Sequence, residues 1–294
     1  MKKGLAYVLM AILMVGMITP SAFANGVINE KLGVPIVVYG ANLSDGEKDR
    51  VRTDLKVANE AEVEELSVDG NDLIKYIPGG DRNARMYSSA KITRQEQGEG
   101  LVINVVTPDN ITQVTADMYA TAMLTAGIED AIVEVASPKK VTGHSALVGI
   151  YKAYEVSGEV LDTERTDTAN DELSLATKLS DKAGVDKDEV AKLLTEIKRQ
   201  IAEQKPATKE DVEKIVSEQL NKFNIQLSDA DRQLLIDLMD RISKLDIDFT
   251  KLNEQLTDMA STIKDKLGEI DPGFWEKVKE FFRNMVDSFK SLFS

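Results

Sequence analysis

The sequence predicts an α+β protein: an N-terminal α/β sandwich with a mixed sheet, followed by an all-helical half that forms a bundle or a coiled coil. Short β-branched runs alternate with helical patterns up to about residue 160, and only helical patterns follow. Fifteen of the eighteen Gly precede residue 160, so the tight turns belong to the first half. An apolar seam with alternating spacings of three and four runs from Leu235 to Ile263.

The first half contains strand and helix patterns in alternation. The strand patterns are rich in β-branched residues and cover 35–40, 63–68, 84–93, 101–106 and 131–136. Two of them, 84–93 and 101–106, predict an antiparallel hairpin across Gly98 and Gly100. The helical patterns cover 47–55, 112–125 and 145–154. The run Asp69-Gly70-Asn71-Asp72 has calcium-loop residue types without a complete loop, so it predicts a turn.

The second half predicts four helices, over 171–183, 185–203, 208–223 and from Ser228 onward. The last is expected to be the longest, and it carries the seam from Leu235 to Ile263. Two interpretations stay open. The seam packs against the preceding helices as an antiparallel bundle, or it supports self-association as a coiled coil. Short connections favour the bundle.

The N-terminus has the pattern of a cleavable signal peptide. Lys2 and Lys3 precede an apolar run of about 14 residues, and small residues follow at Ala22 and Ala24. The run is shorter than the ~20 residues of a membrane span, which argues against an uncleaved anchor. No Cys follows, so no lipid anchor is expected. We therefore divide the chain into a signal peptide (1–24), an α/β domain (25–160), a helical domain (161–270) and an amphipathic C-terminal helix (271–294).

Composition excludes several classes of function. The net charge is −14, and loss of Lys2 and Lys3 with the signal would leave 34 basic against 50 acidic residues, or −16. This balance argues against a nucleic-acid partner, because binding to phosphates needs neutralising cations. The chain has no Cys and a single His. It therefore offers no thiol nucleophile and no site with two imidazoles, and we expect no metal and no cofactor.

The C-terminal segment concentrates the large aromatic residues. The only Trp and five of the eight Phe lie after residue 272, at helical spacings. The residues expected to contact a membrane or a partner are Phe274, Trp275, Phe281, Phe282 and Phe289. Basic residues interleave with this face, as in interfacial membrane helices. The alternative is that the aromatic face docks on the protein's own bundle or on a second copy.

One segment retains the residue types of a small-ligand site. Thr142, Gly143, His144 and Ser145 lead into a predicted helix, whose free amides, two hydroxyls and imidazole could hold an anion or a carboxylate. Plain helix capping by Thr142 or Ser145 is the simpler interpretation. The run Gly143-His144-Ser145-Ala146-Leu147 lacks the final Gly of a hydrolase nucleophile elbow, and its His is adjacent to the Ser.

Several ordered segments resemble the YpuA-like family, exported proteins of Gram-positive bacteria built on a domain of unknown function. They are 38–44, 110–112, 118–120, 125–128 and 141–154. The resemblance covers roughly residues 25 to 270 and implies an extracytoplasmic protein with no catalytic residues to carry over.

The sequence thus favours a secreted, non-catalytic protein of the cell envelope that acts as a binding or interaction module. Its expected partners are a membrane surface, a cell-wall component or a second copy through the 235–263 seam. The alternatives are a small-ligand or anion binder at Thr142–Ser145, or a wall-polymer hydrolase that uses carboxylates, since acidic residues are plentiful.

Overall fold

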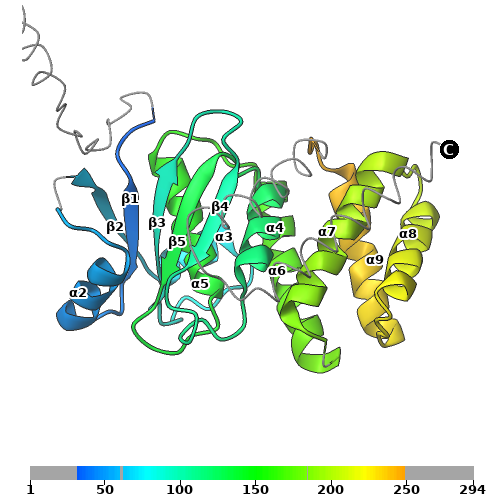
Figure 1. The fold of residues 1–294 in the computed structure, drawn as a ribbon, viewed down its shortest axis with the longest axis horizontal. Helices are drawn as coiled ribbons and strands as arrows, with labels where there is room; N and C mark the ends of the chain where they lie inside the picture. The colour runs from blue at the N-terminus through cyan, green and yellow to red at the C-terminus, as the bar shows by residue number, and fades with distance from the viewer. Residues whose placement is uncertain (1–31, 60–61, 184, 249–294) are drawn as a thin grey trace, which may run out of the picture. The chain divides into compact units, whose positions relative to one another are not determined.

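The computed structural model describes residues 32–59, 62–183 and 185–248. These residues form the predicted α+β fold, with a mixed sheet in the first half and helices alone in the second (Figure 1). The elements in chain order are β1 (Ile36–Gly40), α2 (Asp45–Asp54), β2 (Glu64–Val68), α3 (Gly70–Tyr76), β3 (Ser89–Arg94), β4 (Leu101–Val105), α4 (Ala116–Ala126), β5 (Ala131–Ala136), α5 (His144–Val156), α6 (Thr163–Ala183), α7 (Lys187–Gln204), α8 (Lys209–Lys222) and α9 (Asp229–Lys244).

The five strands form one sheet in the order β2-β1-β3-β5-β4 (Figure 1). The outer pairs β1–β2 and β4–β5 are parallel, whereas β3 runs antiparallel to both of its neighbours. In the register of the sheet, Val38 of β1 lies opposite Leu66 on one side and Ala90 on the other. Every residue of β1 is buried, which explains its unbroken apolar sequence.

The two faces of the sheet are covered unequally. Helices α4 and α5 pack on one face and contribute to the main hydrophobic cluster. Helix α2 packs on the other, where Val51 and Leu55 join Val37 and Tyr39 in a small second cluster. A capping box opens α2, in which the carboxylate of Glu47 accepts a hydrogen bond from the Ser44 amide.

Helix α4 connects the sheet to the helical half. All of its residues from Met118 to Ala126 are buried, on every side of the helix. It packs against β4 on one side and against α6 and α7 on the other. A helix that is enclosed all round belongs to the interior. The main hydrophobic cluster therefore continues from Ile36 in β1 to Ile242 in α9.

The helical half is a bundle within the described residues. The side chains of Thr208 and Ser228 cap α8 and α9, where they accept hydrogen bonds from the amides of Asp211 and Asp231. The first seam residues, Leu235, Leu238 and Ile242, are buried. Helix α9 packs against α6, α7 and α8, so this part of the seam serves the bundle.

The expected length of the last helix is wrong. Helix α9 ends at Lys244, and Leu245 has an extended backbone (φ −73°, ψ 148°). A single helix from Ser228 through Ile263 is therefore excluded. The remainder of the seam, from Phe249 onward, lies outside the described residues.

The predicted hairpin of β3 and β4 is also wrong, because β5 lies between the two strands. The connection from β3 to β4 crosses the start of β5, where Asp130 accepts hydrogen bonds from the amides of Gly98 and Gly100 at 3.0 and 2.9 Å. The carbonyl of Gly100 in turn accepts from the amide of Ala131. The glycines thus serve a crossover instead of a tight turn.

The turn expected at Asp69–Asp72 is the start of helix α3. The Asp69 carboxylate accepts hydrogen bonds from the amides of Asn71 and Asp72 at 2.7 and 3.2 Å, and the Asp72 carboxylate accepts from the Asp69 amide. Turn-forming residue types and N-cap residue types overlap, which explains the error.

Candidate functional site

The predicted Thr142–Ser145 segment lies at the start of α5, directly after β5. Gly143 is the N-cap, with a positive φ of 110°. The Tyr119 hydroxyl donates a hydrogen bond to the Gly143 carbonyl at 2.5 Å, and burial raises the pKa of that phenol. A Cβ at position 143 would come within 2.7 Å of this hydroxyl and 2.8 Å of Ile111, so only Gly fits here.

The two reactive side chains of the segment face different parts of the protein. The Ser145 hydroxyl shares a short hydrogen bond with the Ser88 hydroxyl. The His144 ring has Nε2 3.3 Å from the hydroxyl of Thr177 on α6. Burial lowers the pKa of His144, with Asp181 acting in the opposite direction. The side chains of Ser145 and His144 thus have different partners within the protein.

Thr142 is the exposed member of the segment. Its carbonyl accepts hydrogen bonds from the amides of Gln113 and Val114, both at 3.2 Å. An isolated β-bridge between Ile111 and Val141 joins the segment before α4 to the segment before α5. The structure therefore brings the four predicted residues together, but most of their polar groups have partners inside the protein.

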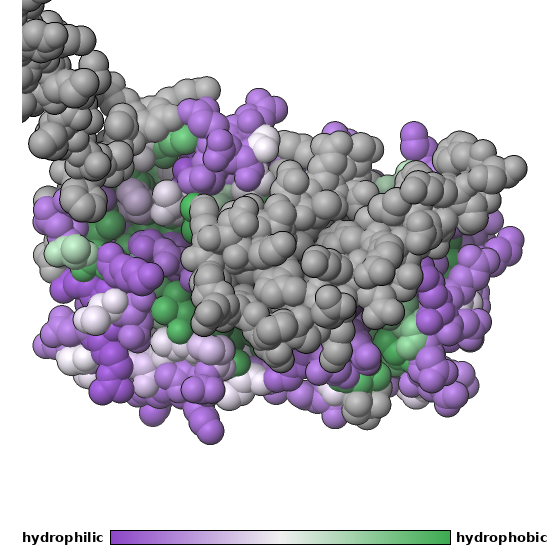
Figure 2. Space-filling model, in the orientation of Figure 1, coloured by the Kyte–Doolittle hydropathy of each residue, from purple (hydrophilic) through white to green (hydrophobic). Residues whose placement is uncertain are grey.

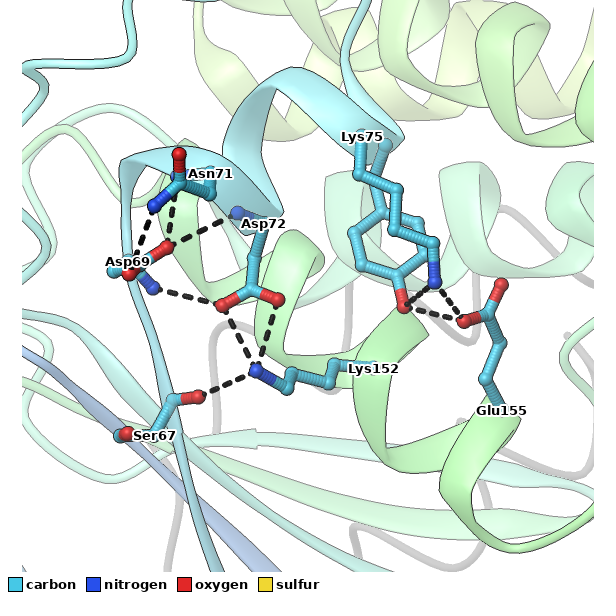
Figure 3. Close-up of polar contacts among 8 residues, drawn as sticks. Ser67, Asp69, Asn71, Asp72, Lys75, Lys152 and Glu155 are labelled. Atoms are coloured by element: carbon cyan, nitrogen blue, oxygen red, sulfur yellow. Dashed lines mark hydrogen bonds and ion pairs between the residues drawn. The ribbon is translucent and has the colours of Figure 1, made fainter.

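A polar cluster that the sequence did not predict joins α3 to α5 (Figure 3). The Lys152 ammonium lies 2.8 and 2.9 Å from the two carboxylate oxygens of Asp72 and donates to the Ser67 carbonyl at 2.9 Å. Because Asp72 also belongs to the capping box, its carboxylate is satisfied within the protein. The calcium-type residues thus form a structural tie beside the edge strand β2.

A second tie, one turn further along both helices, has a similar role (Figure 3). The Tyr76 hydroxyl donates to the Glu155 carboxylate at 2.6 Å, and Lys75 pairs with the same oxygen. Burial, aided by Glu155, raises the pKa of Tyr76 to about 12. The two ties fix α3 against α5.

A buried ionic cluster joins the two halves of the chain. Lys198 of α7 and Glu172 of α6 pair at 2.5 Å, with side chains 0% and 1% exposed. Lys198 also donates to the Thr121 carbonyl at 3.0 Å and to the Thr125 hydroxyl at 2.8 Å, and that hydroxyl donates to Glu172 at 2.6 Å. Local sequence patterns did not predict this cluster, because charged residues on amphipathic helices are usually solvated.

Tyr151 of α5 is fully buried, and burial together with Glu172 raises the pKa of its phenol well above the ordinary value. Its hydroxyl makes no hydrogen bond to the described part of the protein.

In the described ranges, no group of three or more His, Asp or Glu side chains could hold a metal ion. Nor is any helix described there both long and apolar enough to cross a membrane. The predicted contact residues Phe274, Trp275, Phe281, Phe282 and Phe289 lie outside the described residues. Among the residues coloured by hydropathy on the face drawn in Figure 2, hydrophilic side chains predominate and apolar ones form small separate areas.

The sheet, the helical bundle and the polar contacts that join them define an α+β scaffold. Comparison of its sequence with known proteins assigns the family. The chain belongs to the family described as "Protein of unknown function (DUF1002)", whose model matches residues 39–259. It is similar to "Uncharacterized protein YpuA" of Bacillus subtilis (strain 168), at 35% identity over 270 residues, which cover 89% of this chain and 90% of the relative. The family resemblance seen in the sequence is thereby confirmed. No solved structure matches the chain.

Proposed function

We propose that this protein is an exported, non-catalytic interaction module of the cell envelope. The export part is supported by the N-terminal sequence, where two lysines, an apolar run and small residues at Ala22 and Ala24 follow the order of a signal peptide. The non-catalytic part is supported by the contacts at the start of α5.

The observation that carries this part is the separation of Ser145 from His144. A serine nucleophile needs a base within hydrogen-bond reach. Here the Ser145 hydroxyl is bonded to Ser88, while the imidazole lies against Thr177 on α6. Both groups contribute to the packing of α5 instead of facing a common reactant.

The interaction part is supported by the way the two halves are joined. Helix α4 is enclosed between the sheet and α6–α7, and the Glu172–Lys198 pair fastens the junction. A scaffold of this kind holds external surfaces in a constant arrangement. We assign the envelope contact to Phe274, Trp275, Phe281, Phe282 and Phe289, which together would give an aromatic amphipathic face.

Export is tested by fractionating cells that produce the full chain and determining the N-terminal residue of the protein. We expect a product outside the cytoplasm that begins at about Asn25. A product that keeps residues 1–24 and stays in the cytoplasm would refute the export part.

The non-catalytic part is tested with cell-wall polymer and the double variant His144→Ala/Ser145→Ala. We expect no release of soluble fragments by either protein. Release by the wild type that the double variant loses would establish a hydrolase. An increase in Tm with inorganic phosphate that Thr142→Val removes would instead establish the alternative, an anion binder, because a ligand of the native state raises stability.

A further inference from the structure

A groove of about 360 Å³ opens where the described chain ends. It lies between the C-terminal ends of α7 and α9, and its lining is mixed: five of the eight residues are apolar, whereas Lys205, Ser243 and Asp248 are polar. The lining residues are Ile201, Ala202, Lys205, Pro206, Ser243, Leu245, Ile247 and Asp248. The volume is at the small end of the range of ligand pockets, roughly 300–1,000 Å³. It suits a few side chains and not a whole helix.

The local sequence explains which apolar side chains line this groove. Helix α7 ends at Gln204, and the left-handed backbone of Lys205 (φ 47°, ψ 61°) turns the chain toward Pro206, which leaves Ala202 and Pro206 half-buried beside the groove. On the other side, the extended run after α9 alternates, so Leu245 and Ile247 are half-buried while Asp246 and Asp248 are exposed. Apolar side chains therefore line both sides of the groove.

We propose that this groove is the docking site for aromatic side chains of the C-terminal segment 272–294 of the same chain. The described part of the chain ends at Asp248, which itself lines the groove. The aromatic segment follows after 23 intervening residues and holds five Phe and the only Trp. Its aromatic side chains match the apolar residues on the two sides of the groove, such as Ala202 and Ile247.

Tethering favours this occupant over a free partner. The entropic cost of bringing the ends of a loop together grows only slowly with its length. A segment joined by a short linker is present at an effective concentration of about millimolar. Docking here would also remove aromatic surface from water, at about 25 cal/mol per Å² of apolar area.

Docking in the groove does not depend on the proposed function, but its consequence for the envelope contact rests on that function. If the envelope contact uses the same aromatic residues, the groove and the envelope compete for them. The groove would then hold the segment in the free protein and release it to a membrane or wall surface.

Trp275 makes the proposal measurable, because it is the only Trp of the chain. The experiment compares Trp emission in the mature protein, in the isolated peptide 272–294 and in the variant Ala202→Arg, which places a long charged side chain in the groove. We expect emission at shorter wavelength, with weaker acrylamide quenching, in the protein than in the peptide. Ala202→Arg should restore the emission of the peptide.

Gln204→Arg is the matched control, because it adds the same charge two residues further on, at an exposed position that does not line the groove. It should keep the emission of the wild type. Ile247→Ser, which removes an apolar side chain from the opposite side of the groove, should act like Ala202→Arg. Far-ultraviolet circular dichroism checks that each variant is folded.

The proposal is overturned if wild-type emission equals that of the peptide, or if the two arginine variants behave alike. It is also overturned if Trp275 stays shielded in both folded groove variants. These outcomes leave the export and wall-polymer tests untouched, so the two proposals can fail separately.

Discussion

The ammonium group of Lys198 lies 2.5 Å from the carboxylate of Glu172, and both side chains are almost completely buried. Lys198 belongs to α7 and Glu172 to α6, and both bond to Thr125 of α4. The pair therefore fixes two helices of the second half against the helix that covers the sheet. Burial lowers the pKa of Lys198, and Glu172 opposes that shift.

Removal of one partner should be far more costly than removal of both. Lys198→Met leaves the Glu172 carboxylate buried without its counter-ion, and we expect a loss of about 3–5 kcal/mol in the free energy of unfolding. The double variant Glu172→Leu/Lys198→Met should regain most of that loss, because apolar replacements of a buried pair are often neutral. Denaturant titration of the three proteins measures both effects.

The control is the exposed pair Lys209–Asp237, in which the side chains are 47% and 48% exposed. Lys209→Met should leave the free energy of unfolding almost unchanged, as for other surface ion pairs. A loss at Lys198 as small as the loss at Lys209 would show that the buried pair does not fasten the two halves.

Gly143 and Gly46 should respond to Ala in opposite directions. At Gly143 a Cβ would lie 2.7 Å from the Tyr119 hydroxyl, and φ is positive, so we expect Gly143→Ala to cost about 1–3 kcal/mol. At Gly46, inside α2, a Cβ would meet nothing within 4 Å, so Gly46→Ala should stabilise by about 0.4–1 kcal/mol. Thermal unfolding of the two variants provides the comparison, and equal effects would contradict the packing described for Gly143.

Protonation of Asp117 should raise the free energy of unfolding on mild acidification. Burial, with a smaller contribution from Asp188, raises the pKa of Asp117 from 3.8 to about 6, and Lys192 partly opposes this. The folded protein therefore binds a proton more readily than the unfolded chain. The penalty for the ionised carboxylate is complete above pH 6 and is relieved as the pH falls toward 4.

The variant Asp117→Asn isolates this effect. We expect it to be more stable than the wild type at pH 7, by about 1 kcal/mol for each pKa unit of the shift. The difference should shrink as the pH falls from 7 to 5. Any change due to His144, whose lowered pKa acts in the opposite direction, is common to both proteins. A difference that does not depend on pH would rule out Asp117 as the titrating group.

Local signals in the sequence predicted most single elements, because strands and caps depend on nearby residues. The β-branched run over 35–40 and the helical pattern over 47–55 are examples. The pairing of the strands could not be predicted from local patterns. The insertion of β5 between β3 and β4 depends on contacts with Asp130, about thirty residues from the loop that it holds.

The buried polar residues were not predicted for a similar reason. Thr121 and Thr125 lie one turn apart on α4 and look like surface positions. They are buried because α6 and α7 cover that side of the helix, which no local pattern reveals. At Thr142–Ser145, local patterns could not show that Ser88 and Thr177 are the partners of the Ser145 and His144 side chains.

The most direct test of the proposed function is co-sedimentation of the purified mature protein, residues 25–294, with lipid vesicles and with isolated cell-wall material. The matched protein ends at residue 271 and so lacks the five aromatic contact residues. We predict that the mature protein sediments with at least one of the two materials and that the shortened protein stays in solution. Equal partitioning of the two proteins, or no sedimentation of the mature protein with either material, would contradict an envelope interaction through the C-terminal segment.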